Sequence, residues 1–542
     1  MALFSTHKIK SSFIQRLPSL HHEHSSYRWW VLLNVMIGTF MAVLDATIVN
    51  VALPKIMATF GVDVEKAEWV LTAYLLVFAV MLPTSGWVAD HLGYKRTYFG
   101  ALFLFTLGSF LCGLAWNEDA LIMFRVVQAT GAGFLMPVGM AIVAREFPPK
   151  QRGIALGFWS IAAAASVSLG PLIGGYLVDN ISWGAIFDVN VPVGIVGLFA
   201  TLVIQREYKT EQARSFDLVG FISGSVFLGA MLLALSDGNA SWNTGGWTSR
   251  FIVTCFIVSG TALAVFLFTE MTVEHPLIDL KLLKNFNFGV TNAILFIFGL
   301  GMFGSTFLLP LYLQNSLGYT ALQAGAVFLP VGILQALTAP VAGYLSDKVN
   351  PKIPAAIGLF LLALSMYLNA ALSLSTEHAQ IMLPLYIRGF AMGLVFTPLT
   401  TLALSDIPRQ KIAQASGLFN VLRQLGGSFG VALMGALLTR RMIYHSAMYG
   451  QMVDSHSPAF QQVTANLAHF SQNVVGGTPA VAAMRANALV SSNVVQQAFV
   501  RAINDDFLIA GGITALTLIP LFILRTHKKK RNQEQKPAPP IE

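Results

Sequence analysis

Long runs of apolar residues constrain this chain more than any other feature of its sequence. Only 11% of its 542 residues are charged, whereas soluble domains carry about 25%. A helix needs about 20 apolar residues to cross the hydrocarbon core of a bilayer, and fourteen segments between residues 29 and 524 meet that length. The sequence therefore predicts an all-α, polytopic membrane protein with fourteen transmembrane helices.

The distribution of Lys and Arg predicts on which side of the membrane each connection lies. Alternate connections, beginning with residues 1–28, hold 24 of the 34 basic residues, and the opposite connections hold 7. Basic residues concentrate on the cytoplasmic side, so both termini are expected in the cytoplasm. Anionic lipid near that face explains the net charge of +8 without nucleic acid as a partner.

The second half of the chain repeats motifs of the first half. Three pairs of blocks occur in the same order at offsets of 257, 263 and 260 residues. They pair residues 83–95 with 340–352, Arg125 with Arg388, and Gly157 with Gly417. Coincidental loop chemistry would explain one such pair but not three. Two similar bundles of six helices are therefore expected, with two further helices inserted between them.

The expected organisation has five parts. They are a cytoplasmic segment 1–28, a six-helix bundle 29–204, a linker with two extra transmembrane helices 205–288, a second six-helix bundle 289–525 that includes an outer loop 439–505, and a disordered basic cytoplasmic tail 526–542. Paired halves around a site at the membrane midplane are typical of transporters that work by alternating access. A channel or a membrane-embedded enzyme needs no such duplication.

Asp45 is a carboxylate inside an otherwise apolar segment, residues 29–53. A charge at that depth costs at least about 2.5 kcal/mol, so such residues usually pair with another group or carry protons. Arg125 enters its own segment from the same side and is expected near enough to pair with Asp45. We interpret the two as a proton-coupling pair, and the alternative is a structural, hydrogen-bonding Asp near a helix end.

Four blocks of sequence carry motifs. They are LDATIVNVALP at 44–54, GWVADHLGYKR at 86–96, RVVQATGAG at 125–133 and SVSLGPLIGG at 166–175. Together they resemble the major facilitator superfamily, specifically its fourteen-helix drug:proton antiporters, the EmrB/QacA-like group. The likeness runs from about residue 29 to 525. Departures from the family's usual residues are Val88, His91, Tyr94, Ala129 and Ser166.

The block at 86–96 is interpreted as a conformational latch. Its expected members are Gly86, Asp90, Gly93 and Lys95, together with Asp347 in the repeat. Glycine permits close approach of two backbones, and an Asp can meet basic groups or the amino end of a helix. The alternative is an ordinary polar turn. Because the block occurs twice, the latch is favoured.

The block at 166–175 resembles the helix-5 motif of exporters, and its Pro171 is expected to bend the helix. Gly170, Gly174 and Gly175 are expected to pack closely against a neighbouring helix. Polar residues inside other segments are candidates for a central cavity, namely Gln128, Arg388 and Arg423. For Arg423, a role in packing alone remains an equal alternative.

The outer loop 439–505 is longer than a connection between two neighbouring helices requires, since about 2–8 residues are typical. It is expected to form a helical hairpin outside the membrane, with a helical run from Pro479 toward the last span. The resemblance implies a periplasmic adaptor protein and an outer-membrane channel as partners. The alternative is a solvated linker.

The resulting hypothesis is a proton-coupled secondary active antiporter in a bacterial inner membrane. It would export amphipathic, often cationic, toxic compounds and so confer multidrug and antibiotic resistance. The alternative on the same fold is an exporter or importer of one metabolite, such as a siderophore or amino acid. No nucleotide-binding G-x-x-x-x-G-K-[ST] and no H-E-x-x-H motif is present. The sequence therefore predicts no enzyme, no metal site and no cofactor, with an ion gradient as the energy source.

Overall fold

The computed structural model describes residues 26–525, apart from short gaps. The gaps are residues 63, 149–150, 209–215, 239–242, 275, 277–278, 307, 409–410 and 454–455. In these described residues the regular structure is helical and contains no strand. This confirms the predicted all-α class. The expected segments 1–28 and 526–542 lie outside the described residues, except for the first turn of the first helix.

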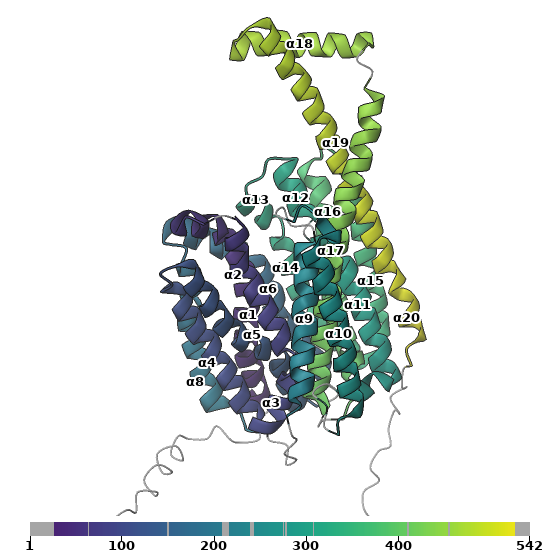
Figure 1. Cartoon of the computed structure of the whole chain (residues 1–542). Helices are drawn as coiled ribbons and strands as arrows, with labels where there is room; N and C mark the ends of the chain where they lie inside the picture. Colours follow the sequence, from purple (N-terminus) through teal and green to yellow (C-terminus); the bar gives the residue numbers. More distant parts are fainter. Residues whose placement is uncertain are drawn as a thin grey trace, which may run out of the picture.

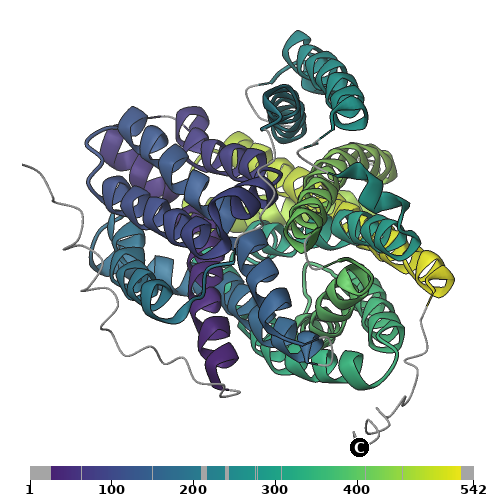
Figure 2. The same cartoon turned by 90° about the horizontal axis from the view of Figure 1, so that it is seen from below.

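The first half of the chain forms one group of packed helices. They are α1 (Ser26–Phe60), α2 (Val64–Met81), α3 (Ser85–Leu92), α4 (Tyr94–Gly113), α5 (Glu118–Glu146), α6 (Arg152–Asn180), α7 (Ala185–Asp188) and α8 (Asn190–Ile204). Next come α9 (Leu218–Asp237) and α10 (Arg250–Thr272). These two pack against each other on the outside of the molecule, as Figure 2 shows.

The second half forms the other group. Its helices are α11 (Phe286–Thr306), α12 (Leu308–Asn315), α13 (Ala321–Ala326), α14 (Leu329–Lys348), α15 (Lys352–Leu368), α16 (His378–Leu404), α17 (Ile412–Met452), α18 (Pro458–Val475), α19 (Pro479–Leu516) and α20 (Leu518–Ile523). The apolar faces of each group pack inward, and a large cluster of buried side chains draws on both halves.

The number of membrane-crossing helices fits the fourteen expected. Within the described residues, 11 helices are long and apolar enough to cross a bilayer, or 13 if two bent pairs each count as one span. One bent pair joins α2 to α3, and the other is α6 itself. A further helix, α4, has 20 residues and packs against α5 and α8, so the described helices are consistent with fourteen spans.

The two halves meet most closely at the end of the molecule that carries α3 and α20 (Figure 1). There α6 runs along α14, and α17 packs against both α3 and α5. Glycine makes this approach possible, because a Cβ on Gly157 would lie only 2.5 Å from the carbonyl oxygen of Ala339. The closest packing between the halves therefore lies at the α3 end and not at the end that carries α18.

The region expected as an outer loop is mostly continuous helix. Figure 1 shows α17 and α19 rising beyond the bundle, with α18 lying across their tips. The helical run from Pro479 is confirmed, and the segment after residue 438 is also helical, because α17 continues to Met452. At 1.5 Å per residue its 41 residues extend about 60 Å, twice the hydrocarbon thickness. We call the part from residue 439 to 505 the arm.

Candidate functional site

Asp45 and Arg125 form a buried ion pair. Asp45 lies in the middle of α1 and is 0% exposed, and Arg125 lies two turns into α5 and is 1% exposed. Nη1 of Arg125 contacts Oδ2 of Asp45. Nε of the same guanidinium donates to the carbonyl oxygen of Val70 in α2, at 3.1 Å. The pairing agrees with the depths of the two residues in the sequence, and the additional contact with Val70 means that the pair ties three helices of the first half together.

Gln128 joins this pair. Its Nε2 donates to Oδ1 of Asp45 at 2.7 Å and to Oγ of Ser109 at 2.7 Å, while its Oε1 accepts from Arg125 at 2.7 Å. Nδ2 of Asn190 also approaches Oδ1 of Asp45, at 3.4 Å. Ser109 and Asn190 were missed by sequence reasoning. Neither residue lies in the four motif blocks given above.

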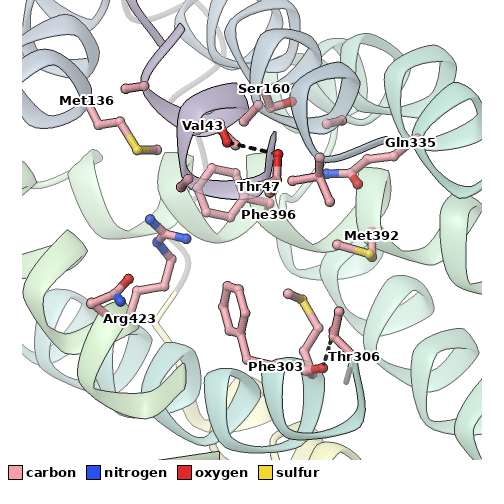
Figure 3. Close-up of a pocket in the computed structure, with 18 of the residues that line it drawn as sticks. Val43, Thr47, Met136, Ser160, Phe303, Thr306, Gln335, Met392, Phe396 and Arg423 are labelled. Carbon is pink, nitrogen blue, oxygen red and sulfur yellow. Dashed lines mark hydrogen bonds between the residues drawn. The ribbon is translucent and has the colours of Figure 1, made fainter. Parts of the chain in front are cut away.

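A central cavity of about 310 Å³ lies between the two halves. It is lined by α1, α2, α5 and α6 of the first half and by α11, α14, α16 and α17 of the second. A volume of this order suits a small organic ligand. Most of the lining is apolar or aromatic, and Figure 3 shows part of it, including Phe303, Phe396, Met136 and Met392.

Tyr74 connects the ion pair with the cavity. The centre of its ring lies 4.0 Å from the guanidinium carbon of Arg125. Its hydroxyl donates to the carbonyl oxygen of Ala42 at 3.2 Å, and both residues belong to the cavity lining. Asp45 and Gln128 do not belong to that lining. Gln128, expected in the cavity, instead belongs to the hydrogen-bond network of the ion pair.

Arg388 and Arg423 both line the cavity. Nη2 of Arg388 donates to Oγ1 of Thr306 at 2.6 Å and approaches the carbonyl oxygen of Met302 at 3.3 Å. Nη2 of Arg423 donates to Oδ1 of Asn420 at 3.4 Å. Figure 3 shows the Arg423 guanidinium directed into the cavity. The structure thus favours a cavity position for Arg423, although sequence left packing alone as an equal alternative.

Asp347 joins the halves at the α3 end. It lies at the carboxyl end of α14, and its oxygens accept from the backbone N–H groups of Gly153 and Ile154 at 3.0 and 2.9 Å. These groups belong to the first turn of α6. An anion is stabilised there because the first N–H groups of a helix lack partners within the helix and the helix dipole is positive at this end.

The other latch candidates lie in the matching place of the first half. Gly86 of α3 lies against Gln414 in the first turn of α17. The hydroxyl of Tyr94 donates to Asp90 at 3.1 Å. Gly93, with φ of 97°, makes the sharp turn between α3 and α4. The contact of α3 with α17 therefore mirrors the contact of α14 with α6.

Lys95 lies outside that contact. Its Nζ donates to the carbonyl oxygen of Leu202 at 2.7 Å, and its backbone N–H donates to Oε1 of Glu207 at 3.1 Å. Leu202 belongs to α8, and Glu207 follows α8 in the connection to α9. The structure therefore places Lys95 on the surface between α4 and α8, and its hydrogen bonds within the described residues reach no helix of the second half.

The helix-5 motif lies in the bent part of α6. The helix axis bends by 41° between Val167 and Leu172, where Pro171 was expected to bend it, and the side chain of Pro171 lies outside the described residues. Within the bend Gly170 faces Thr47, and beyond it Gly174 faces Ile48, both in α1. Gly175 faces Leu322 of the second half.

Comparison with known proteins agrees with this geometry. The model of the Major Facilitator Superfamily matches residues 35–431. The multidrug export protein EmrB of Haemophilus influenzae is 32% identical over 494 residues, covering 90% of this chain and 94% of EmrB. The uncharacterized MFS-type transporter YhcA of Bacillus subtilis is 30% identical over 513 residues, covering 93% of this chain and 94% of YhcA.

Among solved structures, the human organic anion transporter MFSD10 aligns with a TM-score of 0.57 at 13% identity. The alignment covers 91% of this chain and 99% of that one, and it shows a shared fold. The family match and relatives named as transporters indicate a membrane transporter and not an enzyme. The chain belongs to the major facilitator superfamily.

Proposed function

We propose that this chain is a proton-coupled exporter of amphipathic compounds that works by alternating access in a bacterial inner membrane. The observation that carries the proposal is the buried Asp45–Arg125 pair, separated from the cavity by Tyr74. EmrB of Haemophilus influenzae is named a multidrug export protein, which supports export of varied compounds. A cavity lined mainly by apolar and aromatic groups suits such compounds.

Asp45 is suited to carry the coupled proton because its environment depends on its charge. When ionised, it accepts hydrogen bonds from Arg125 and Gln128. A protonated carboxyl has one fewer acceptor site and no longer attracts the guanidinium. Protonation would therefore loosen the contact between α1 and α5. Tyr74 contacts both the guanidinium and the backbone of α1, so the change would reach the cavity wall.

We assign the structure to an outward-facing conformation. The closest contacts between the halves, those of α14 with α6 and of α3 with α17, lie at the α3 end. The positive-inside rule predicts that this end faces the cytoplasm. Release of the Asp347 contact would then be required before the cavity opens to the cytoplasm. Asp347, Gly86, Asp90 and Gly93 are the proposed latch.

The arm is the proposed docking site for a periplasmic adaptor that leads to an outer-membrane channel. It projects beyond the bundle on the side opposite α3 (Figure 1). The helix at its tip, α18, exposes large apolar side chains, with Val463 51%, Phe470 62% and Val474 66% exposed. Exposed apolar groups on an extended element are typical of surfaces that meet another protein.

The proposal is tested by changing Asp45→Asn in inverted membrane vesicles. The amide keeps nearly the same shape but cannot ionise, and it is less costly to bury than a carboxylate. The variant should fold and exchange probe in both directions without a gradient, but it should not accumulate probe when a proton gradient is imposed. A panel of dyes and antibiotics that includes ethidium and 8-anilinonaphthalene-1-sulfonate supplies the probes.

Asp119→Asn is the matched control, because Asp119 is an exposed acid at the start of α5, the helix that carries Arg125. It should accumulate probe like the wild type. Gradient-driven accumulation by the Asp45→Asn variant at the wild-type rate would show that Asp45 does not couple transport to protons. Asp45 would then be a structural residue.

A further inference from the structure

The charge of the central cavity is of one sign. Two of its lining residues, Arg388 and Arg423, are cationic, and the lining contains no Asp or Glu among the described residues. Asp45, the carboxylate proposed to carry the coupled proton, is already paired with Arg125 and lies outside the lining. A cation that enters this cavity would meet two positive charges and no described negative one.

Neither arginine has its charge balanced within the described part of the chain. The hydrogen-bond partners of Arg388 are the hydroxyl of Thr306 and a backbone carbonyl, and the partner of Arg423 is the amide of Asn420. These groups are neutral, and no described carboxylate lies within 4.0 Å of either guanidinium. Buried charges are usually paired, so each is available to a negative group brought in by a ligand.

Both guanidinium groups also have spare donors. Nη1 of Arg388 and Nε of Arg423 are buried and have no hydrogen-bond partner among the described residues. Arg388 as a whole is only 2% exposed. A planar guanidinium binds carboxylate, sulfonate or phosphate oxygens in pairs, which makes such a donor specific for oxyanions. A buried donor without a partner is destabilising, and an oxyanion would remove that cost.

The rest of the wall defines the body of the ligand. Figure 3 shows the rings of Phe303 and Phe396 between Arg423 and Thr306 in the cavity wall. Thr306 is the hydrogen-bond partner of Arg388. Neutral polar groups are few, and Gln335 and Gln424 are among them. An apolar or aromatic body would therefore fill the cavity while its charged group reaches an arginine.

We propose that the cavity recognises amphipathic organic anions, with Arg423 and Arg388 as the groups that bind the oxyanion. The inference rests on the proposed export function and gives it a substrate class. It replaces the often cationic substrate expected from sequence by one of opposite charge. Arg423 is the principal contact, because its one hydrogen bond among the described residues is long and goes to a neutral amide.

The test is a titration of the full chain in lipid nanodiscs with two fluorescent probes of opposite charge. The anion is 8-anilinonaphthalene-1-sulfonate and the cation is ethidium, with empty nanodiscs subtracted. The wild type should bind the anion at least tenfold more tightly than the cation. Arg423→Gln should weaken anion binding at least tenfold. Arg423→Lys, which keeps the charge but cannot bind two oxygens side by side, should weaken anion binding less than Arg423→Gln does.

Arg440→Gln is the matched control, since Arg440 is an exposed arginine on α17 beyond the cavity. It should bind the anion like the wild type. Because wild-type selectivity needs no variant, misfolding of the Arg423→Gln variant does not prevent the test. Tighter binding of ethidium, absence of anion binding, or an unchanged anion affinity in a folded Arg423→Gln variant would each overturn the inference.

This titration is independent of coupling because it uses no gradient. If Asp45→Asn vesicles accumulate probe normally while the anion binds through Arg423, the coupling proposal fails and the substrate class stands. If ethidium accumulates in a manner that needs Asp45 while the anion does not bind, the substrate class fails and the coupling proposal stands.

Discussion

The contact of Asp347 with the amino end of α6 allows a quantitative prediction. Two backbone N–H groups donate to its carboxylate at 3.0 and 2.9 Å, and hydrogen bonds to charged groups contribute about 1.5–3 kcal/mol each. Water compensates part of the loss when the carboxylate is removed. Asp347→Ala should therefore destabilise the state closed at the α3 end by about 2–4 kcal/mol, which shifts the conformational equilibrium about 30- to 700-fold.

The shift is measured by electron–electron distance spectroscopy between spin labels at Arg96 and Ile353. Both side chains are largely exposed, and they lie in different halves at the α3 end. The two native cysteines, Cys112 and Cys255, are first changed to Ala. The wild type should give one short distance, and the Asp347→Ala variant should add a longer one. Asp347→Asn, which keeps one acceptor oxygen, should give an intermediate result.

Asp217→Ala separates this effect from ordinary helix capping. Asp217 accepts from the backbone N–H of Gly220 at 2.7 Å at the start of its own helix, α9. This hydrogen bond lies within one helix and does not connect the two halves. Its removal should leave the distances unchanged. If a folded Asp347→Ala variant also gives the wild-type distances, the contact does not hold the halves together, and the reasoning that treats Asp347 as part of a latch is refuted.

Three further predictions concern packing, the arm and orientation. Gly108→Ala should destabilise the protein by about 1–3 kcal/mol in a thermal unfolding assay, because a Cβ there would lie 2.5 Å from the backbone N of Gln128. Gly100→Ala in the same helix is the control. Its Cβ would meet nothing within 4 Å, so it should not destabilise the protein. Replacing 446–500 by a short Gly/Ser linker should preserve accumulation in vesicles but reduce the resistance of whole cells, and the docking proposal fails if resistance is unchanged. Cysteines at positions 348 and 470 should react from the cytoplasm and the periplasm respectively, and the reverse labelling would contradict the positive-inside assignment.

Sequence reasoning found the ion pair but not all of its surroundings. The depths of Asp45 and Arg125 in their segments could be counted, so their pairing was predictable. Gln128 was assigned to the cavity because a polar residue within a span usually faces one, yet residues three apart lie on the same helix face. It therefore accompanies Arg125. Ser109 and Asn190 meet the pair only through tertiary packing, which spacing along the chain does not reveal.

The arm and the charge of the cavity were harder to predict for other reasons. The polar residues after 438 end the hydrophobic run, and the segment still contains Ala, Met and Arg, which favour helix. Hydropathy therefore gave the membrane boundary but not the end of α17. Arg388 and Arg423 were identified as cavity candidates from sequence alone. Whether a carboxylate faces them depends on how eight helices are arranged around the cavity.

A cavity with two arginines and no described carboxylate also has an electrical consequence. When a monovalent anion leaves the cell and a proton enters, each movement adds one positive charge to the inside. One exchange therefore transfers two positive charges inward across the membrane. Each elementary charge gains about 2.3 kcal/mol per 100 mV of membrane potential, so the two together gain about 4.6 kcal/mol at that voltage. Export would then continue on voltage alone after the pH difference collapses, whereas exchange of a monovalent cation for one proton would be electrically silent.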